Sequence, residues 1–205
     1  MKDMNINKAI RKQSKSYKRF VLSMCFIFFI LPLFLIYYKK FDLFYISFLS
    51  VIEVMILISI IISSRRELLN FEYETGRLKL KIGFSREKIN ILCNKILYVD
   101  VKITPSEVNG FQDFKILLLS NSKFKNKKMK KVNQDFMKEY TLVSYHYIKF
   151  KQRSPEDEFY YLIINAGGLK KYKLLDTIFK SCVNAGFSQE SIEKIKIYRD
   201  SLSQV

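Results

Sequence analysis

Two long apolar stretches near the start of the chain constrain its fold more than any other feature. They cover Phe20–Tyr38 and Leu43–Ser64, and only four residues separate them. Because an α-helix rises about 1.5 Å per residue, the first stretch would extend about 28 Å, close to the thickness of the hydrocarbon core of a bilayer. The sequence therefore predicts a transmembrane helical hairpin over residues 20–64, with everything after it held at one membrane face.

The basic residues around the two stretches predict the orientation of this hairpin. Residues 1–19 contain seven Lys and Arg and a single Asp, and Arg65 and Arg66 directly follow the second stretch. The short connection carries only Lys39 and Lys40. Since basic residues that flank a span stay preferentially in the cytoplasm, we expect a multi-pass protein of the inner (plasma) membrane with both termini in the cytoplasm.

A cleaved signal peptide and a buried hairpin of a soluble protein are the two alternatives. The first stretch is too long for the apolar region of a signal peptide, no small-x-small cleavage pattern follows it, and a second stretch comes at once. Neither stretch has a polar face, which a hairpin on a soluble core would expose to water. The membrane hairpin is therefore the preferred interpretation.

The whole chain carries a net charge of +17, and this positive charge is concentrated outside the apolar stretches. The densest run, residues 123–131, contains no acid and six lysines, which are Lys123, Lys125, Lys127, Lys128, Lys130 and Lys131. An anionic leaflet attracts such segments by about 1 kcal/mol per Lys or Arg, and Phe124 and Met129 inside the run would dip into lipid.

Three interpretations of this lysine run remain open. It can be a solvated surface loop, a lipid-contacting loop, or a loop that follows a phosphate backbone through its mixture of aromatic and basic residues. If the hairpin tethers the body to a membrane, lipid is always within reach of the lysine run and is favoured over nucleic acid as its contact. We therefore do not expect a nucleic-acid partner. Together with Arg65 and Arg66, the six lysines are the predicted lipid- or partner-binding residues.

Beyond Asn70 the pattern changes from unbroken apolarity to alternation, which predicts strands. A hairpin over Phe71–Phe84 turns at Thr75-Gly76, and its two strands are the first of seven. The next five are predicted over Lys88–Leu92, Tyr98–Thr104 (ended by Pro105), Phe111–Ser120, Tyr140–Gln152 and Phe159–Ala166. Helical spacing then predicts one helix over Leu169–Ala185 and a last one over Gln189–Leu202.

Seven antiparallel strands followed by a helix predict a small barrel or split sheet of the α+β class. The hairpin "FEYETGRLKLKIGF" and the following "NKILYVDV" make the chain resemble bacterial pleckstrin-homology-like (PH-like) membrane proteins, in which a two-helix anchor precedes such a domain. The resemblance implies the fold rather than a ligand. The predicted organisation is a basic segment (1–19), the hairpin (20–64), a PH-like domain with a capping helix (65–186) and a C-terminal helix (187–205).

Few residues suggest chemistry. The sequence has no phosphate-cradling glycine-rich loop and no GxSxG or HExxH motif. Cys25, Cys93 and Cys182 do not have the spacing of a metal site or a disulfide framework, and His146, the single histidine, has no evident nucleophile beside it. We therefore expect no enzymatic activity, no cofactor and no metal.

Glu53 lies in the middle of the second apolar stretch, where a charge costs about 2.5–3.5 kcal/mol on insertion scales. A buried carboxyl needs a hydrogen-bond partner, which Ser23, Ser47, Ser50 or another subunit could supply. Helix–helix association is the preferred role, ahead of simple tolerance of the residue or of proton transport.

Three functions follow from these features. The first is a non-catalytic membrane adaptor or assembly subunit, whose cytoplasmic domain binds protein partners, anionic phospholipid or both, within a larger complex or a homo-oligomer. The second is a ligand-gated effector, in which the β domain senses a small anion such as a cyclic nucleotide and the helices oligomerise to disrupt the bilayer. The third, a transporter or channel component, needs more polar membrane faces than Glu53 alone provides.

Overall fold

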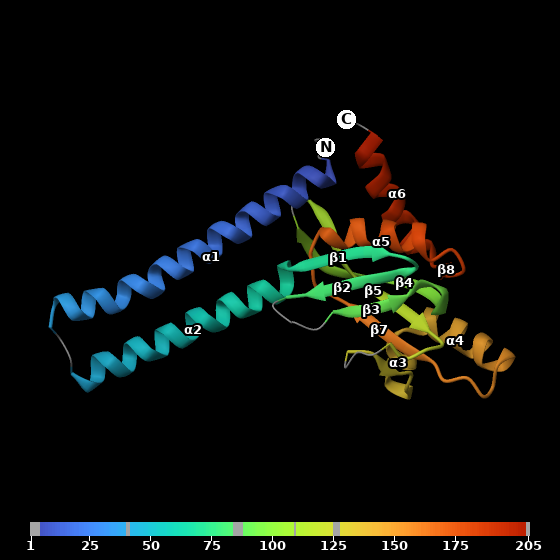
Figure 1. The fold of residues 1–205 in the computed structure, drawn as a ribbon, viewed down its shortest axis with the longest axis horizontal. Coiled ribbons are helices and arrows are strands. Elements are labelled where there is room, and N and C mark those ends of the chain that lie inside the picture. Colours follow the sequence, from blue (N-terminus) through green and yellow to red (C-terminus); the bar gives the residue numbers. More distant parts are fainter. Residues whose placement is uncertain (1–4, 40–41, 84–87, 109, 125–127, 204–205) are drawn as a thin grey trace.

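The computed structural model describes residues 5–39, 42–83, 88–108, 110–124 and 128–203. Two long helices form a hairpin that projects from an α+β body (Figure 1). They are α1 (Ile6–Tyr37) and α2 (Leu43–Glu67). Both are long and apolar enough to cross a membrane.

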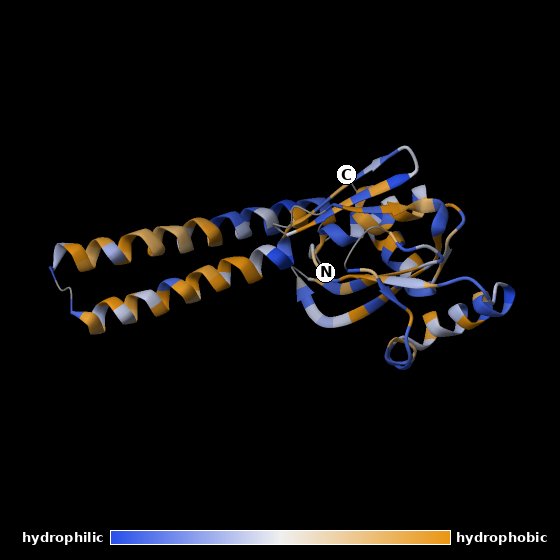
Figure 2. Cartoon of the chain, turned by 60° about the horizontal axis from the view of Figure 1, so that its bottom comes forward, coloured by the Kyte–Doolittle hydropathy of each residue, from blue (hydrophilic) through white to orange (hydrophobic). Residues whose placement is uncertain are grey.

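The projecting part of the hairpin exposes its apolar side chains. None of the most apolar 18-residue window of α1 is buried inside the molecule, and only 6% of that of α2 is. Figure 2 shows the outer part of both helices as largely hydrophobic, whereas the part of α1 beside the body is hydrophilic. A core hairpin of a soluble protein would bury these side chains, so the exposure speaks against that alternative.

Residues 6–19 of the predicted basic segment (1–19) belong to the first helix. Asn5 caps α1, which then runs without interruption from Ile6 through Pro32 to Tyr37. Its first turns pack against the body, because Ile6 and Ala9 are completely buried. Cleavage after a signal peptide would remove this packing, so the structure also speaks against the signal-peptide alternative.

A three-stranded antiparallel sheet follows α2 directly, in the order β1-β2-β3. Its strands are β1 (Leu69–Glu74), β2 (Arg77–Ile82) and β3 (Ile89–Leu92), and the short 3-10 helix η1 (Cys93–Lys95) comes next. The predicted hairpin and its turn at Thr75-Gly76 are confirmed, with Glu74 paired to Arg77. Both turn residues have positive φ, which suits a tight hairpin.

A mixed five-stranded sheet, in the order β6-β7-β5-β4-β8, forms the middle layer of the body. Its strands are β4 (Ile96–Val108), β5 (Phe111–Ser120), β6 (Lys130–Lys131), β7 (Tyr160–Ile164) and β8 (Gly186–Phe187). The predicted burial of β5 on both faces is confirmed, because Ile116 and Leu118 join one apolar cluster while Leu117 and Leu119 join another.

Helices cover both faces of this sheet. They are α3 (Gln134–Glu139), α4 (Thr141–Arg153), α5 (Lys170–Ser181) and α6 (Gln189–Ser203). The larger apolar cluster joins the three-stranded sheet, α5, α6 and the start of α1, and the smaller one joins α3 and α4 to the opposite sheet face. The two predicted C-terminal helices are thus confirmed as α5 and α6, with shifted ends.

The predicted sixth strand, Tyr140–Gln152, is wrong, since this segment forms α4. Its residues also carry a helical pattern, in which Val143, Tyr147 and Phe150 face the smaller cluster at spacings of four and three. Alternating Leu142, Ser144 and His146 hid this pattern in the sequence. The segment lies beside helix α3 and packs on the sheet instead of pairing within it.

Two further differences concern the strands. Pro105 does not end β4, because the pairing between β4 and β5 shifts between Ile103 and Glu107, and an irregularity of this kind tolerates a residue without an N–H. The two sheets also remain separate among the described residues, so of the two predicted forms, a barrel or a split sheet, the closed barrel is not formed.

Candidate functional site

A cavity of about 1150 Å³ lies where α2 leaves the apolar hairpin and meets the body. Arg65 and Arg66, at the end of α2, line it from the side of the hairpin, and Ile61 lies one turn earlier. The other charged residues that line it are Glu67, the last residue of α2, and Lys115, Lys128, Lys171 and Asp113 from the body. We call this space the junction cavity.

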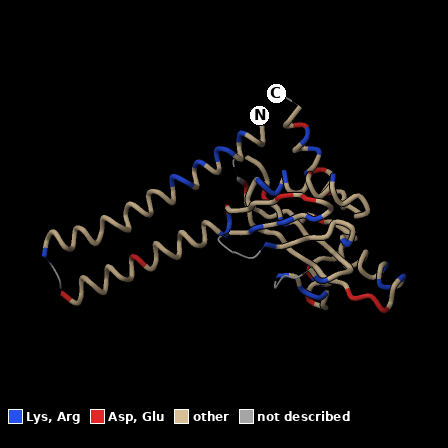
Figure 3. The backbone as a smooth tube through the Cα atoms, viewed as in Figure 1, with Lys and Arg blue, Asp and Glu red and all other residues tan. Residues whose placement is uncertain are grey.

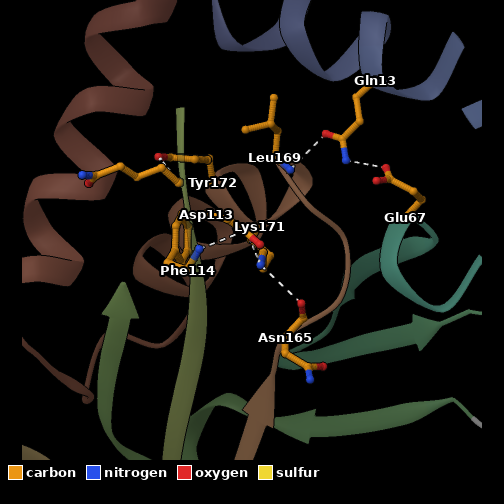
Figure 4. Close-up of polar contacts among 9 residues, drawn as sticks. Gln13, Glu67, Asp113, Phe114, Asn165, Leu169, Lys171 and Tyr172 are labelled. Atoms are coloured by element: carbon orange, nitrogen blue, oxygen red, sulfur yellow. Dashed lines mark hydrogen bonds and ion pairs between the residues drawn. The ribbon is translucent and has the colours of Figure 1, made fainter. Parts of the chain in front are cut away.

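A buried ion pair forms the inner wall of the junction cavity. Lys171, on α5, is 1% exposed, and its Nζ lies 2.6 Å from Oδ1 of Asp113 on β5. The ammonium also donates to the carbonyl oxygen of Asn165 at 3.3 Å (Figure 4) and lies 5.5 Å from the ring centre of Phe114. Burial lowers the pKa of Lys171, while the hydrogen bond and charge of Asp113 oppose that change.

Gln13 joins the hairpin to the body beside this wall. Its amide oxygen accepts from the N–H of Leu169 at 3.1 Å, and its amide nitrogen donates to the Glu67 carboxylate (Figure 4). One side chain of α1 therefore contacts both the end of α2 and the loop before α5. The hairpin helices are also linked directly by a 2.6 Å hydrogen bond between Tyr17 and Ser64.

The cavity carries unbalanced positive charge. Among the described residues Arg65, Arg66 and Lys115 form no salt bridge, whereas Lys171 is paired with Asp113. Figure 3 shows Lys and Arg gathered along the hairpin close to the body, with long stretches of both helices free of charge. Exposed guanidinium and ammonium groups around one hollow favour an anion with several acceptor oxygens, such as a phosphate group.

The structure brings together three of the eight predicted binding residues, Arg65, Arg66 and Lys128, in this cavity. Lys130 and Lys131 form strand β6, and Lys131 pairs with Glu158 instead of lining the cavity. The remaining predicted lysine that the structure describes, Lys123, is exposed in the loop before β6. Lys125 and Lys127 lie outside the described residues.

The expectation that Phe124 and Met129 dip into lipid is wrong. Each is only 4% exposed and belongs to the larger apolar cluster of the body. The N–H of Phe124 also donates to the sulfur of Met129 at 3.2 Å. Burial inside the protein already removes the apolar surface of these two residues from water, so no lipid contact is needed. Their packing holds both ends of the lysine run against the body.

Glu53 is not part of the junction cavity. It lies on α2 twelve residues before Arg65, which corresponds to about 18 Å along the helix. Its side chain is half-buried, and among the described residues no hydrogen bond or salt bridge involves it. The predicted partners Ser23, Ser47 and Ser50 therefore do not contact it through a polar bond within this single chain.

Sequence reasoning missed the body residues of the cavity. Asp113 and Lys115 gave a usable signal, since they stand two apart at the beginning of an otherwise apolar strand and so share one face. Lys171 gave none, because a lysine beside Tyr172 on an amphipathic helix is normally solvent-exposed. Only the packing of α5 against β5 buries it.

Within the described residues, no group of three or more His, Cys, Asp and Glu side chains is arranged to hold a metal ion. The charged residues at the junction are mostly cations arranged around a hollow.

The chain was also compared with known proteins. No protein family, no curated protein and no solved structure was found to match it. The PH-like resemblance therefore stays a prediction, and the fold that the structure supports is an α+β body with two long apolar N-terminal helices.

Proposed function

We propose that this protein is a non-catalytic membrane adaptor whose junction cavity binds the phosphate of an anionic phospholipid. The hairpin spans the inner membrane, both termini and the body lie in the cytoplasm, and the body offers its outer surfaces to protein partners. The cations in the cavity fix the body against the headgroup layer.

The observation that carries this proposal is the position of the unpaired cations. Arg65 and Arg66 follow the apolar part of α2 without a break in the helix, so a hairpin that crosses a bilayer places them at headgroup depth. Lys115 reaches the same cavity from the body. Each cation near an anionic membrane surface contributes about 1 kcal/mol to binding that surface. One guanidinium group can also donate two parallel hydrogen bonds to the oxygens of a phosphate.

Charge removal in the cavity tests this function. The full chain is purified in a neutral detergent and titrated with phosphatidylglycerol or phosphatidylcholine, and bound lipid is counted by native mass spectrometry. We expect preferential binding of phosphatidylglycerol. The double variant Arg65→Gln/Lys115→Gln should lose about 2 kcal/mol, or about thirtyfold in affinity, because two charges near the phosphate are removed.

The matched control is Lys149→Gln/Arg153→Gln, which removes the same charge from exposed positions on α4, outside the junction cavity. Arg66 and the basic start of α1 are kept in the test variant, so the orientation signal is preserved. Equal loss in both double variants would show a general charge effect and contradict the proposed site. Binding of a soluble cyclic nucleotide in place of phospholipid would favour the ligand-gated effector instead.

A further inference from the structure

A second hollow, of about 260 Å³, lies beside the end of α3 and the start of α4. Most of the charged residues that line it are acidic, although the chain as a whole is strongly basic. It lies between β4, the junction of α3 with α4, and the start of α6. The residues that matter in it are Asp100, Ile103, Glu139, Tyr140, Leu142 and Glu190. We call it the acidic groove, and Figure 1 shows α4 on the side of the body away from the hairpin.

Asp100 provides a buried carboxyl group in the wall of the groove. The residue is 6% exposed, and its Oδ1 atom is buried without a hydrogen-bond partner among the described residues. Buried carboxylate oxygens are normally paired, because an unpaired one retains the cost of desolvation. Glu190, from α6, adds a second carboxyl whose charge acts on Asp100, and like charges at one site favour a bound cation.

Among the described residues, no Lys or Arg forms a salt bridge with Asp100. Lys102, the next residue on the same face of β4, is directed at the end of α3, where its Nζ lies 3.4 Å from a carboxylate oxygen of Glu139. It also lies 4.6 Å from the ring centre of Tyr140. Among the described residues neither Asp100 nor Glu190 takes part in a salt bridge.

The rim of the groove is apolar. Ile103 is 46% exposed and Leu142 is 55% exposed, and both line the hollow. An acidic floor with aliphatic walls matches the side chains of Arg and Lys, which combine a charged head with a methylene stem.

From these contacts we propose that the acidic groove binds a basic side chain presented by a partner protein, with the guanidinium or ammonium head at Asp100 and Glu190 and the stem on Ile103 and Leu142. The groove faces away from the hairpin, so a cytoplasmic protein can reach it while the chain is anchored. This proposal does not depend on lipid binding at the junction cavity.

His146 provides a reporter for this site, because it is the only histidine of the chain. Its ring stacks on Tyr98 with centroids 3.9 Å apart, and the charge of Asp100 acts on it. Burial lowers the pKa of His146, as does the charge of Lys149, while Asp100 opposes both. The other titratable groups around Asp100 are Lys102 and Tyr98 on β4, Glu139 and Tyr140 at the end of α3, and Glu190 on α6.

The experiment titrates the full chain, in detergent micelles and with labelled histidine, with acetyl-arginine-amide and follows the His146 ring signals by NMR. We expect a saturable shift and a lower His146 pKa, because the bound cation offsets the charge of Asp100. The neutral isostere acetyl-citrulline-amide should give no saturable shift. Free guanidinium ion should bind at least tenfold more weakly than the arginine compound, since it lacks the stem.

Asp100→Asn should lower affinity for acetyl-arginine-amide at least tenfold, and Glu190→Gln severalfold. Glu190 is partly exposed, so Glu190→Gln tests the groove even if Asp100→Asn does not fold. The control is Glu193→Gln, the same change at an exposed position of α6, which should bind as the unaltered chain does. Equal binding of the citrulline compound, equal binding of free guanidinium, or unchanged affinity in Glu190→Gln would overturn the proposal.

Discussion

Gly167 and Gly168 show how single residues hold the hairpin against the body. Both have positive φ, and the N–H of Gly167 donates to the carbonyl oxygen of Arg66 at 2.6 Å, which gives a partner to a carbonyl at the end of α2. A Cβ atom on Gly167 would lie 2.5 Å from the side chain of Leu69. Glycine is therefore required here both by the backbone conformation and by the space.

This requirement predicts the effect of adding one methyl group. Gly167→Ala should lower the free energy of unfolding by about 1–3 kcal/mol more than Gly76→Ala does, because the methyl group also overpacks against Leu69. Gly76 is a matched control, since its φ is also positive but nothing lies within 4 Å of its added Cβ. Thermal unfolding of the full chain in detergent, followed by circular dichroism, measures both. Equal melting temperatures would contradict the close contact at Gly167.

At the level of the elements, helix α1 belongs to two environments. Its outer part exposes apolar side chains, whereas its first turns are buried against the body, where they contact α6 and Ile6 belongs to the larger cluster. Gln13 is the polar link in this interface, bonded to both Leu169 and Glu67. Because the helix is continuous, the position of its outer part in the proposed membrane and the contact of its first turns with the body would be coupled.

Removing that link should loosen the start of α1. Gln13→Ala leaves the Leu169 N–H and the Glu67 carboxylate with one partner fewer, at a cost of about 1–3 kcal/mol. We expect amide hydrogen exchange in the first turns of α1 to become about tenfold faster, measured by mass spectrometry on the full chain. The control Gln152→Ala changes an exposed glutamine on α4. Unchanged exchange in Gln13→Ala would show that apolar packing alone holds the helix.

At the scale of the whole molecule, two features need contacts that one copy of the chain does not provide. The hairpin exposes apolar side chains, and Glu53 lies half-buried among them. We propose that lipid surrounds the apolar side chains. A carboxyl group in the middle of a span needs a hydrogen-bond partner, and within the described residues it has none, so a second helix from another subunit is the expected source.

Replacing this carboxyl group tests the assembly. Glu53→Leu should reduce cross-linking between copies of the chain, or co-purification with membrane partners, by about half or more, because the interhelical hydrogen bond is lost. Val54→Leu is the control, since Val54 is the exposed neighbour on the same helix. Membrane-embedded chains are compared by cross-linking before extraction. Identical assembly in both variants would exclude the association role of Glu53.

The length and periodicity of apolar runs were enough to predict many elements. The two apolar helices, the hairpin around Gly76, the doubly buried strand β5 and the last two helices all follow from local patterns. The wrong strand at residues 140–152 arose because a local pattern can fit two structures. Residues 140–152 satisfy both a strand and a helix pattern, and packing of Val143 and Phe150 on the sheet selects the helix.

The candidate sites were only partly predictable, because much of each site depends on contacts between residues distant in sequence. Arg65 and Arg66 could be predicted, because basic residues directly after an apolar run typically mark the cytoplasmic end of a membrane span. The burial of Phe124 and Met129, the Lys171–Asp113 pair and the unpaired oxygen of Asp100 were not, because each depends on residues distant in sequence. By itself, the sequence determined which segments are apolar enough to span a membrane and which carry the charge. The tertiary structure alone decided which charges share a cavity, since only folding sets the distances through which charges act.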